Sequence, residues 1–195
     1  MVSLKHTEHT IEDLMDLPED TKAELIDGEI YMMAPAAAKH SIVNGALTSV
    51  IYNHFREKRK NGSGDGHDFW LIVPEAWNYY DEHNSFVHGI AGYLESEISE
   101  PPQSGPIMTK PMWLCEILSP SNWSNDTQRK RVILEEHRVP HYWLVDPERK
   151  TIQVLEMPDG ATKYQFAHAV DVKDGTVKLP PFMDLELDLT EIFRH

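Results

Sequence analysis

The feature that most constrains the fold of this chain is an apolar run at 112–119, MWLCEILS, with one glutamate, Glu116, near its centre. Apolar side chains on both sides of Glu116 predict a strand that is buried on both faces of a sheet. An ionised carboxylate in such a strand costs several kcal/mol unless it is paired, protonated or bound to a metal ion. The run therefore predicts a central strand and requires a partner for Glu116.

Two kinds of partner are consistent with the sequence around Glu116. The first is a basic residue of the next predicted helix, namely Arg129, Lys130 or Arg131, or a strand end that opens to solvent. The second is a hard divalent cation such as Mg²⁺, which takes oxygen ligands from one or two carboxylates, water and phosphate. A site of the second kind hydrolyses phosphodiesters by activating water, while a lysine stabilises charge on the phosphate.

Strand and helix signals alternate along the rest of the chain. Asp27-Gly28 between two apolar runs predicts a hairpin, and the apolar spacing from Ile42 to Phe55 predicts a helix over 39–58. The other predicted elements are a short helix between Thr10 and Pro18, strands at 69–80, 85–95, 141–146 and 151–157, a helix at about 127–137 capped by Asn125 or Asp126, and a final strand with a terminal turn or helix at 185–193. The pattern predicts one α/β or α+β domain over residues 1–195, built around a central sheet.

Composition narrows the class of protein. The net charge of -14 argues against a protein that coats nucleic acid, although an enzyme can still hold nucleic acid in one basic groove. No apolar stretch of about 18 residues predicts a membrane span, and the first residues are too polar for a secretory signal. The single cysteine, Cys115, fits a buried hydrophobe better than a nucleophile and agrees with a reducing compartment, so we expect a cytoplasmic protein.

Several stretches together resemble the Uma-two family of proposed restriction endonucleases, which belongs to the PD-(D/E)xK nuclease-like superfamily. They are AELIDGEIYMMAP, His40, CEILSPSN, the segment from Asp126 to Lys130, and VPHYWLVDPERKTIQV. The resemblance runs from about Thr10 to Phe193. It implies a restriction-endonuclease-like central mixed sheet flanked by helices, and a metal-dependent nuclease site.

The resemblance also assigns residues to that site. Glu24 matches an acidic residue that assists metal binding, and Glu116 matches the acid of the ExK half-motif. Leu118 stands two residues after Glu116 where that half-motif has lysine, and Lys130 on the next helix matches the family's lysine. The implied cofactor is Mg²⁺ or Mn²⁺, and the implied partner is DNA, with a homodimer left open.

One departure from the family pattern affects the metal site directly. Relatives carry Pro-Asp in a pattern like VPDIAGY, whereas this chain reads VHGIAGY, with His88 and Gly89 at those positions. Three explanations follow: the chain is catalytically inactive, His88 supplies a nitrogen ligand that favours Mn²⁺ or Zn²⁺, or a nearby carboxylate replaces the aspartate. Glu75 is the best such carboxylate, and Asp81 and Glu95 are weaker ones.

Other candidate residues carry less specific signals. His40 is a candidate substrate contact or a helix-capping histidine, and Trp123, in the loop after Glu116, is a candidate base contact. The basic run 58–60 fits a solvated helix end or a phosphate contact. Two other functions remain as alternatives to the nuclease: an inactive relative that binds nucleic acid or protein, and an oligomeric structural protein that associates through its exposed hairpins.

Overall fold

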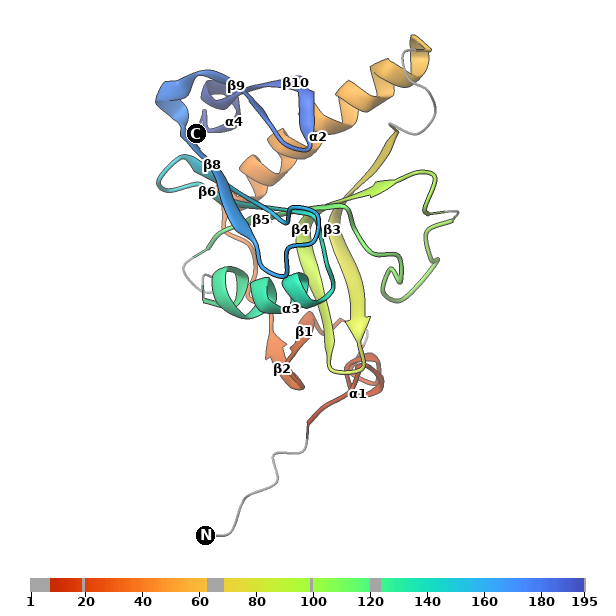
Figure 1. Cartoon of the computed structure of the whole chain (residues 1–195). Coiled ribbons are helices and arrows are strands. Elements are labelled where there is room, and N and C mark those ends of the chain that lie inside the picture. The colour runs from red at the N-terminus through yellow and green to blue at the C-terminus, as the bar shows by residue number, and fades with distance from the viewer. Residues whose placement is uncertain (1–7, 19, 63–68, 99, 120–123, 195) are drawn as a thin grey trace.

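The computed structural model describes residues 8–18, 20–62, 69–98, 100–119 and 124–194 (Figure 1). Its elements in chain order are α1 (Ile11–Met15), β1 (Ala23–Ile26), β2 (Glu29–Met32), α2 (Ala38–Lys60), β3 (Trp70–Asp81), β4 (Asn84–Leu94), β5 (Trp113–Ile117), the π-helical turn η1 (Asn125–Arg129), α3 (Lys130–Glu136), β6 (His141–Asp146), β7 (Thr151–Glu156), β8 (Gln165–Asp171), the short 3₁₀ turn η2 (Val172–Asp174), β9 (Thr176–Leu179), β10 (Phe182–Asp188) and α4 (Leu189–Ile192). Within these residues, no helix is long and apolar enough to cross a membrane.

Eight strands form one mixed sheet. Seven follow each other in the order β2-β1-β4-β5-β6-β7-β8, and β3 pairs with β4 outside this path. β5 and β6 pair in parallel, and the other strand pairs are antiparallel. The parallel pair follows from the chain path, because β5 reaches β6 through the helical crossover η1–α3. The predicted central mixed sheet is thus confirmed.

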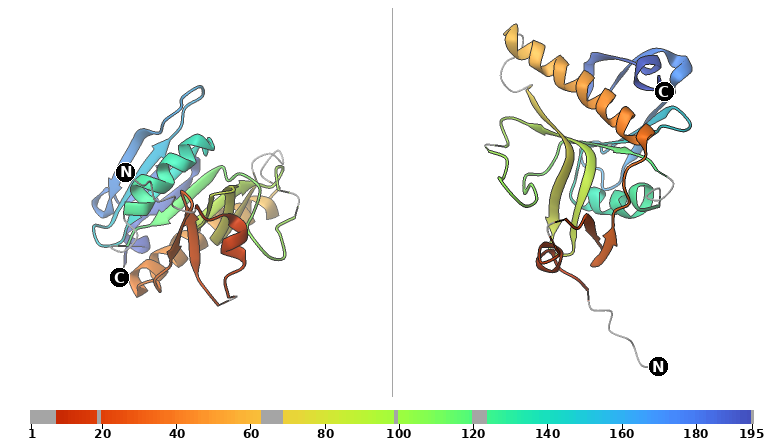
Figure 2. Two further views of the ribbon diagram at one scale, coloured as in Figure 1. Left: turned by 90° about the horizontal axis from the view of Figure 1, so that it is seen from below. Right: turned by 180° about the vertical axis from the view of Figure 1, so that it is seen from behind.

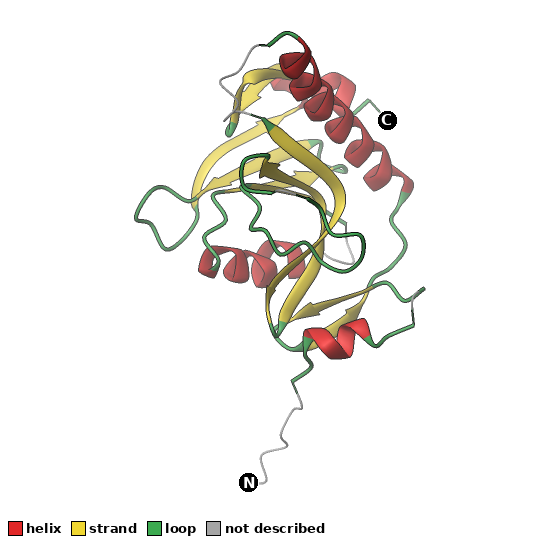
Figure 3. Ribbon diagram, turned by 90° about the vertical axis from the view of Figure 1, so that its right-hand side faces the viewer, coloured by secondary structure: helices red, strands yellow, loops and turns green. Residues whose placement is uncertain are grey.

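Helices cover both faces of this sheet. The long helix α2 crosses one face and α3 lies against the other (Figures 1 and 3). Val43, Leu47 and Phe55 of α2 pack in one core, together with the C-terminal strands β9 and β10, and Ile133 and Leu134 of α3 pack in the other. Figure 2 shows from behind that the C-terminal elements lie beside α2. Two cores on opposite faces leave the central strands largely buried.

The central strand is as buried as its sequence predicts. All five residues of β5 are buried, and Trp113, Leu114 and Cys115 have no exposed surface. Burial raises the pKa of the Cys115 thiol well above its usual value, and the neighbouring Glu116 charge adds to this effect. Cys115 is therefore a packed side chain rather than a reactive thiolate.

The predicted elements agree with the structure except in three places. The helix near 127–137 begins earlier, because 125–129 already form the π-helical turn η1, so Asn125 and Asp126 do not occupy the predicted cap position. The strands β8 and β9 were not predicted: β8 is an edge strand with a largely exposed, mixed sequence, and β9 has four residues. Weak alternation over short edge strands gives little sequence signal.

Candidate active site

The site lies at a fork in the sheet, where two strands meet the same strand β4. β4 pairs with β1 through Ser85 opposite Leu25, and with β5 through Ile90, Ala91 and Gly92. Between these two stretches, the backbone of Val87 and Gly89 has no strand partner on this side. Buried backbone groups need hydrogen bonds, so side chains have to supply them at the fork.

Four side chains satisfy these backbone groups. The N–H of Val87 donates to Glu24 Oε1 at 3.0 Å, and its carbonyl oxygen accepts from Lys130 Nζ at 3.2 Å. The N–H of Gly89 donates to Glu116 Oε2 at 3.2 Å, and its carbonyl oxygen accepts from Asn44 Nδ2 at 3.1 Å. The open fork therefore gathers two acids, an ammonium group and an amide around two residues of β4.

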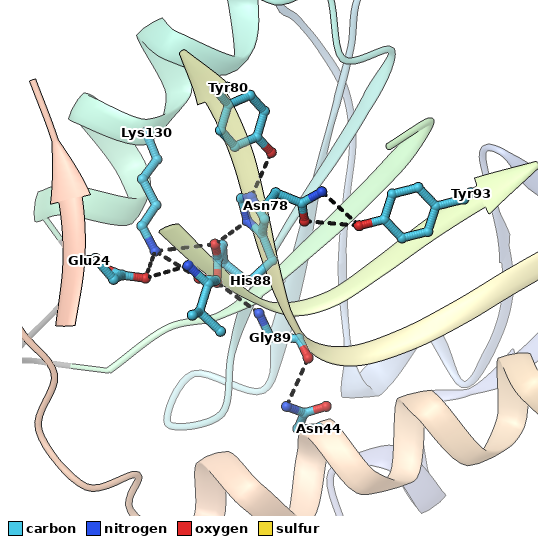
Figure 4. A network of polar contacts seen from close by, with 10 residues as sticks. Glu24, Asn44, Asn78, Tyr80, His88, Gly89, Tyr93 and Lys130 are labelled. Atoms are coloured by element: carbon cyan, nitrogen blue, oxygen red, sulfur yellow. Dashed lines mark hydrogen bonds and ion pairs between the residues drawn. The ribbon is translucent and has the colours of Figure 1, made fainter. Parts of the chain in front are cut away.

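Lys130 joins the two acids electrostatically. Its Nζ lies 2.9 Å from Glu24 Oε1 and 3.5 Å from Glu116 Oε1, as Figure 4 shows for Glu24. The three side chains are almost completely buried, with Lys130 only 2% exposed. Burial alone raises the pKa of the Glu116 carboxyl, but Lys130, His88 and the N–H of Gly89 outweigh it and hold the pKa well below its usual range. Of the two kinds of partner that the sequence left open for Glu116, the structure shows a basic residue of the next helix, Lys130.

His88 forms the second partner of Glu116. Its Nδ1 lies 2.6 Å from Glu116 Oε1. Its Nε2 lies 2.7 Å from the hydroxyl of Tyr80, a contact drawn in Figure 4. His88 is fully buried, and burial raises the pKa of the Tyr80 hydroxyl well above its usual value, so this hydroxyl keeps its proton. Both ring nitrogens are thus engaged, and a metal bond from either would break one of these contacts.

Beside the fork, the side chains of β3 and of β4 each change the face of the sheet toward which they point. Phe86 and Ile90 are four residues apart and would share one face of a regular strand, yet they pack in different cores. Ile72 and Ala76 of β3 behave in the same way. Between them Glu75 has a φ of 49°, a left-handed conformation that costs a non-glycine residue about 1–2 kcal/mol. At this inversion Glu75 lies close to Gly89 of the fork, since both accept hydrogen bonds from one amide group.

Asn44 of α2 contacts both β3 and β4 at this inversion. Its Nδ2 donates to Glu75 Oε1 at 3.0 Å as well as to the carbonyl oxygen of Gly89. Sequence reasoning missed Asn44, although it shares the buried face of α2 with Val43, Leu47 and Ile51. A lone amide on an otherwise apolar helix face was the available signal, because a buried amide needs hydrogen-bond partners.

A cavity of about 610 Å³ opens over the fork. Among its lining residues, those that the sequence had pointed to are Glu24, Glu75, Glu116, Lys130, His88 and His40. Trp77, which sequence reasoning took for a core residue, also lines the cavity, and its indole N–H donates to Ser85 Oγ at 2.8 Å. No sequence signal indicated this position, because Trp77 stands in an ordinary strand pattern.

The cavity also has features that suit an anion. Ala37 and His40, at the N-terminal end of α2, line it, and no side chain caps the first N–H groups of this helix. The Nδ1 atom of His40 is buried and has no hydrogen-bond partner among the residues that the structure describes. Helix N-termini carry partial positive charge and favour phosphate or carboxylate groups.

The remaining sequence candidates lie elsewhere. Asp81 contacts His137 and Glu95 contacts Arg59, and neither acid lines the cavity. The basic run 58–60 is paired with acids at the surface, which fits the solvated helix end. Trp123 lies outside the described residues.

Whether a divalent cation fits the site depends on the metal-ligating groups that it offers. Within the described residues, no group of three or more His, Cys, Asp or Glu side chains is arranged to hold a metal ion. Glu24, Glu116 and the carbonyl of Val87 nevertheless converge on one point, because all three accept from the same Lys130 Nζ. Since Mg²⁺ is usually held by one or two carboxylates with water and substrate oxygens, this set of oxygens fits such an ion once the ammonium leaves the point.

A mixed α/β sheet with two buried acids and a lysine at a cavity is the architecture of a nuclease-like domain, and comparison with known proteins agrees. The family model Uma2, described as "Putative restriction endonuclease", matches residues 11–190. The chain therefore belongs to the Uma2 family, as its sequence motifs indicated.

A solved structure supports the same class. The chain is similar to "a putative nuclease belonging to DUF820 from Anabaena variabilis ATCC 29413", with a TM-score of 0.73 and 25% sequence identity. The match covers 95% of this chain and 97% of that one. Comparison with curated proteins gives no match.

Proposed function

We propose that this chain is a divalent-metal-dependent endonuclease that hydrolyses DNA phosphodiester bonds. In this proposal Glu24 and Glu116 are the ligands of Mg²⁺ or Mn²⁺, and Lys130 is the residue that stabilises charge on the phosphate. The observation that carries the proposal is the convergence of these three side chains at the cavity. Family membership and the nuclease neighbour support the class of reaction.

The chain's own residues prepare the site for this chemistry. The N–H groups of Val87 and Gly89 orient the two carboxylates, and His88, anchored on Tyr80, fixes Glu116 Oε1. When bound, a divalent ion supplies an activated water and neutralises developing charge. The proposal gives His88 the role of orienting Glu116 rather than of a metal ligand, because both its ring nitrogens are engaged.

The cavity suits a nucleotide segment. The Nδ1 atom of His40 has no hydrogen-bond partner within the described part of the chain, and with the uncapped N-terminus of α2 it offers a donor for a phosphate. Lys22 adds a positive charge. Trp77 belongs to a wall on which a sugar or base can pack. Trp123 as a base contact, a homodimer and a cytoplasmic location stay predictions from the sequence.

Gly89 favours a second candidate, a catalytically inactive relative that binds nucleic acid or a protein partner. Glycine offers no carboxylate where relatives have aspartate. Glu75 lines the cavity but bonds to Asn44, and it does not form a three-ligand group with the other acids of the described chain. The two acids already contact Lys130, His88 and backbone N–H groups, so each has polar partners without a metal.

Plasmid cleavage with Mg²⁺ or Mn²⁺ distinguishes the two candidates. The nuclease proposal expects nicking by the wild type and at least a 100-fold loss in Glu116→Gln. Gly89→Asp should increase cleavage, and Gly89→Ala serves as its control. An added Cβ at Gly89 would meet the carbonyl oxygen of Cys115 at 3.1 Å and Ile117 at 3.5 Å, so both variants need the same small shift.

Each outcome assigns one function. Cleavage by Gly89→Asp but not by the wild type supports the inactive relative, since the fold then lacks only the acid. Absence of cleavage in both proteins with either ion rejects the enzymatic proposal. Fluorescence anisotropy with labelled single-stranded and duplex DNA then tests binding.

A further inference from the structure

The ammonium group of Lys130 occupies a site built from oxygen atoms. Glu24 Oε1 lies 2.9 Å from Nζ, the carbonyl oxygen of Val87 lies 3.2 Å away, and Glu116 Oε1 lies 3.5 Å away. Two carboxylates and a backbone carbonyl form the kind of ligand set that a hard divalent cation takes. The lysine is 2% exposed, so it sits inside this set rather than at its rim.

Gly89 adds no acid to this set, so Lys130 offsets fewer buried carboxylates than the family pattern implies. With aspartate absent there, the fork holds two carboxylates, Glu24 and Glu116, and Glu116 is also held by His88. A third carboxylate would leave an excess of buried negative charge that one lysine does not balance. The site thus sets one ammonium group against two carboxylates, with His88 as a hydrogen-bond partner of Glu116, in a place where the family pattern implies one more acid.

A divalent cation and the ammonium cannot share this point. They carry the same sign, and burial weakens the screening that would let them lie side by side. Lys130 also lines the cavity, so its ammonium can turn from the carboxylates toward a phosphate held there. It is the first residue of α3, directly after the π-helical turn η1, an irregularity frequent at functional sites.

We propose that Lys130 is a built-in counter-ion that competes with divalent cations for the oxygen site formed by Glu24, Glu116 and the Val87 carbonyl. The cation binds when the ammonium leaves, and an anionic substrate in the cavity favours that departure. Metal and nucleic acid therefore bind with positive coupling. This inference rests on the proposed function, since it concerns the same metal site.

The test measures Mn²⁺ affinity by isothermal titration calorimetry and by the electron paramagnetic resonance signal of free Mn²⁺. Lys130→Met should bind Mn²⁺ at least about tenfold more tightly than the wild type, because a competing charge has been removed. Lys163→Met is the matched control: Lys163 Nζ lies 2.9 Å from another buried acid, Glu135, away from the cavity, and this variant should stay within about twofold of the wild type.

A second measurement uses the wild-type protein and does not depend on whether Lys130→Met folds. With lysine labelled by ¹³C at the ε carbon, the Lys130 resonance is assigned by its loss in Lys130→Arg. Saturating Mg²⁺ should shift this resonance and leave that of Lys22 in place. A non-cleavable phosphorothioate oligonucleotide should tighten Mn²⁺ binding to the wild type. By thermodynamic linkage, Mn²⁺ should tighten oligonucleotide binding by the same factor.

The outcomes separate this inference from the nuclease proposal. Mn²⁺ binding by Lys130→Met but not by the wild type supports the competition, and it argues against metal-dependent cleavage by the wild type if the oligonucleotide does not restore Mn²⁺ binding. Equal or weaker binding by a folded Lys130→Met, or an unmoved Lys130 resonance with Mg²⁺ bound, overturns the competition and leaves the nuclease proposal standing. Absence of Mn²⁺ binding in both proteins overturns both.

Discussion

The hydrogen bond between Tyr80 and His88 offers a clean test of how Glu116 is positioned. Tyr80→Phe removes the hydroxyl that lies 2.7 Å from His88 Nε2 and keeps the ring that stacks on Phe86 at a centroid distance of 4.7 Å. The substitution therefore changes one polar contact and little of the packing. If His88 needs this anchor, Glu116 Oε1 loses its fixed partner.

The size of the effect follows from burial. His88 is fully buried, and a buried polar atom that loses its only partner costs about 1–3 kcal/mol of unfolding free energy. For a chain of this length, each kcal/mol lowers the melting temperature by about 2–4 °C. Tyr80→Phe should therefore melt about 2–12 °C below the wild type. Loss of a residue that orients a metal ligand typically costs about 10-fold or more in metal affinity, so Mn²⁺ binding should weaken by about that factor.

Tyr93→Phe is the matched control. It also removes a tyrosine hydroxyl, here from the neighbouring strand β4. This hydroxyl accepts from Asn78 Nδ2 at 2.7 Å and donates to Asn78 Oδ1 at 2.9 Å. Its melting temperature should fall at least as far, because two contacts are lost, but Mn²⁺ affinity should not change. Equal loss of Mn²⁺ affinity in both variants would show that stability alone explains the effect.

The assay pairs differential scanning calorimetry with ¹⁵N-edited spectra of the histidine rings. A ring N–H of His88 should be visible and protected from exchange in the wild type and in Tyr93→Phe, and it should broaden in Tyr80→Phe. This readout needs no metal. An unchanged His88 signal together with an unchanged melting temperature in Tyr80→Phe would refute the reasoning.

Buried charges at the fork and on α3 make three more outcomes measurable. Lys130→Met should lower the unfolding free energy by about 3–5 kcal/mol in urea titrations, since it leaves two buried carboxylates without their ammonium. Because the pKa of Glu116 is depressed in the folded state, its stabilising charge is present above pH 4.5 and is lost as the pH falls toward about 2, so wild-type stability should fall over this range more steeply than that of Glu116→Gln. Glu135→Gln should cost about 1–3 kcal/mol without changing Mn²⁺ affinity, because this buried acid bonds to Arg131 and to the N–H of Tyr164, away from the cavity.

Patterns of local sequence were enough for most of the fold. The apolar run around Glu116, the Asp27-Gly28 turn and the spacing of apolar residues in α2 each predicted an element that the structure confirms. Local pattern failed where tertiary contacts decide. The start of the helix before Lys130 depends on the π-helical turn η1, and the edge strand β8 forms because β7 offers it a partner.

The residues of the candidate site also differ in whether local sequence could predict them. Glu116 was conspicuous because a charge in an apolar strand is costly, and family motifs added Glu24 and Lys130. Tyr80 and Asn44 were missed, since each looks like an ordinary strand or helix residue until the fold places it beside Glu116 or Gly89. A hydrogen bond between residues far apart in sequence leaves no local periodicity.

By itself, the sequence predicted a mixed α/β sheet with a buried acid in its central strand, because apolar periodicity and one charged residue in an apolar run were sufficient for that. Its resemblance to the family pattern added the expectation that Gly89 stands where that pattern has aspartate. Only the tertiary structure decided what surrounds the acid. Because β1 and β5 meet β4 at separate places, they leave a fork whose backbone groups are satisfied by Glu24, Glu116 and Lys130.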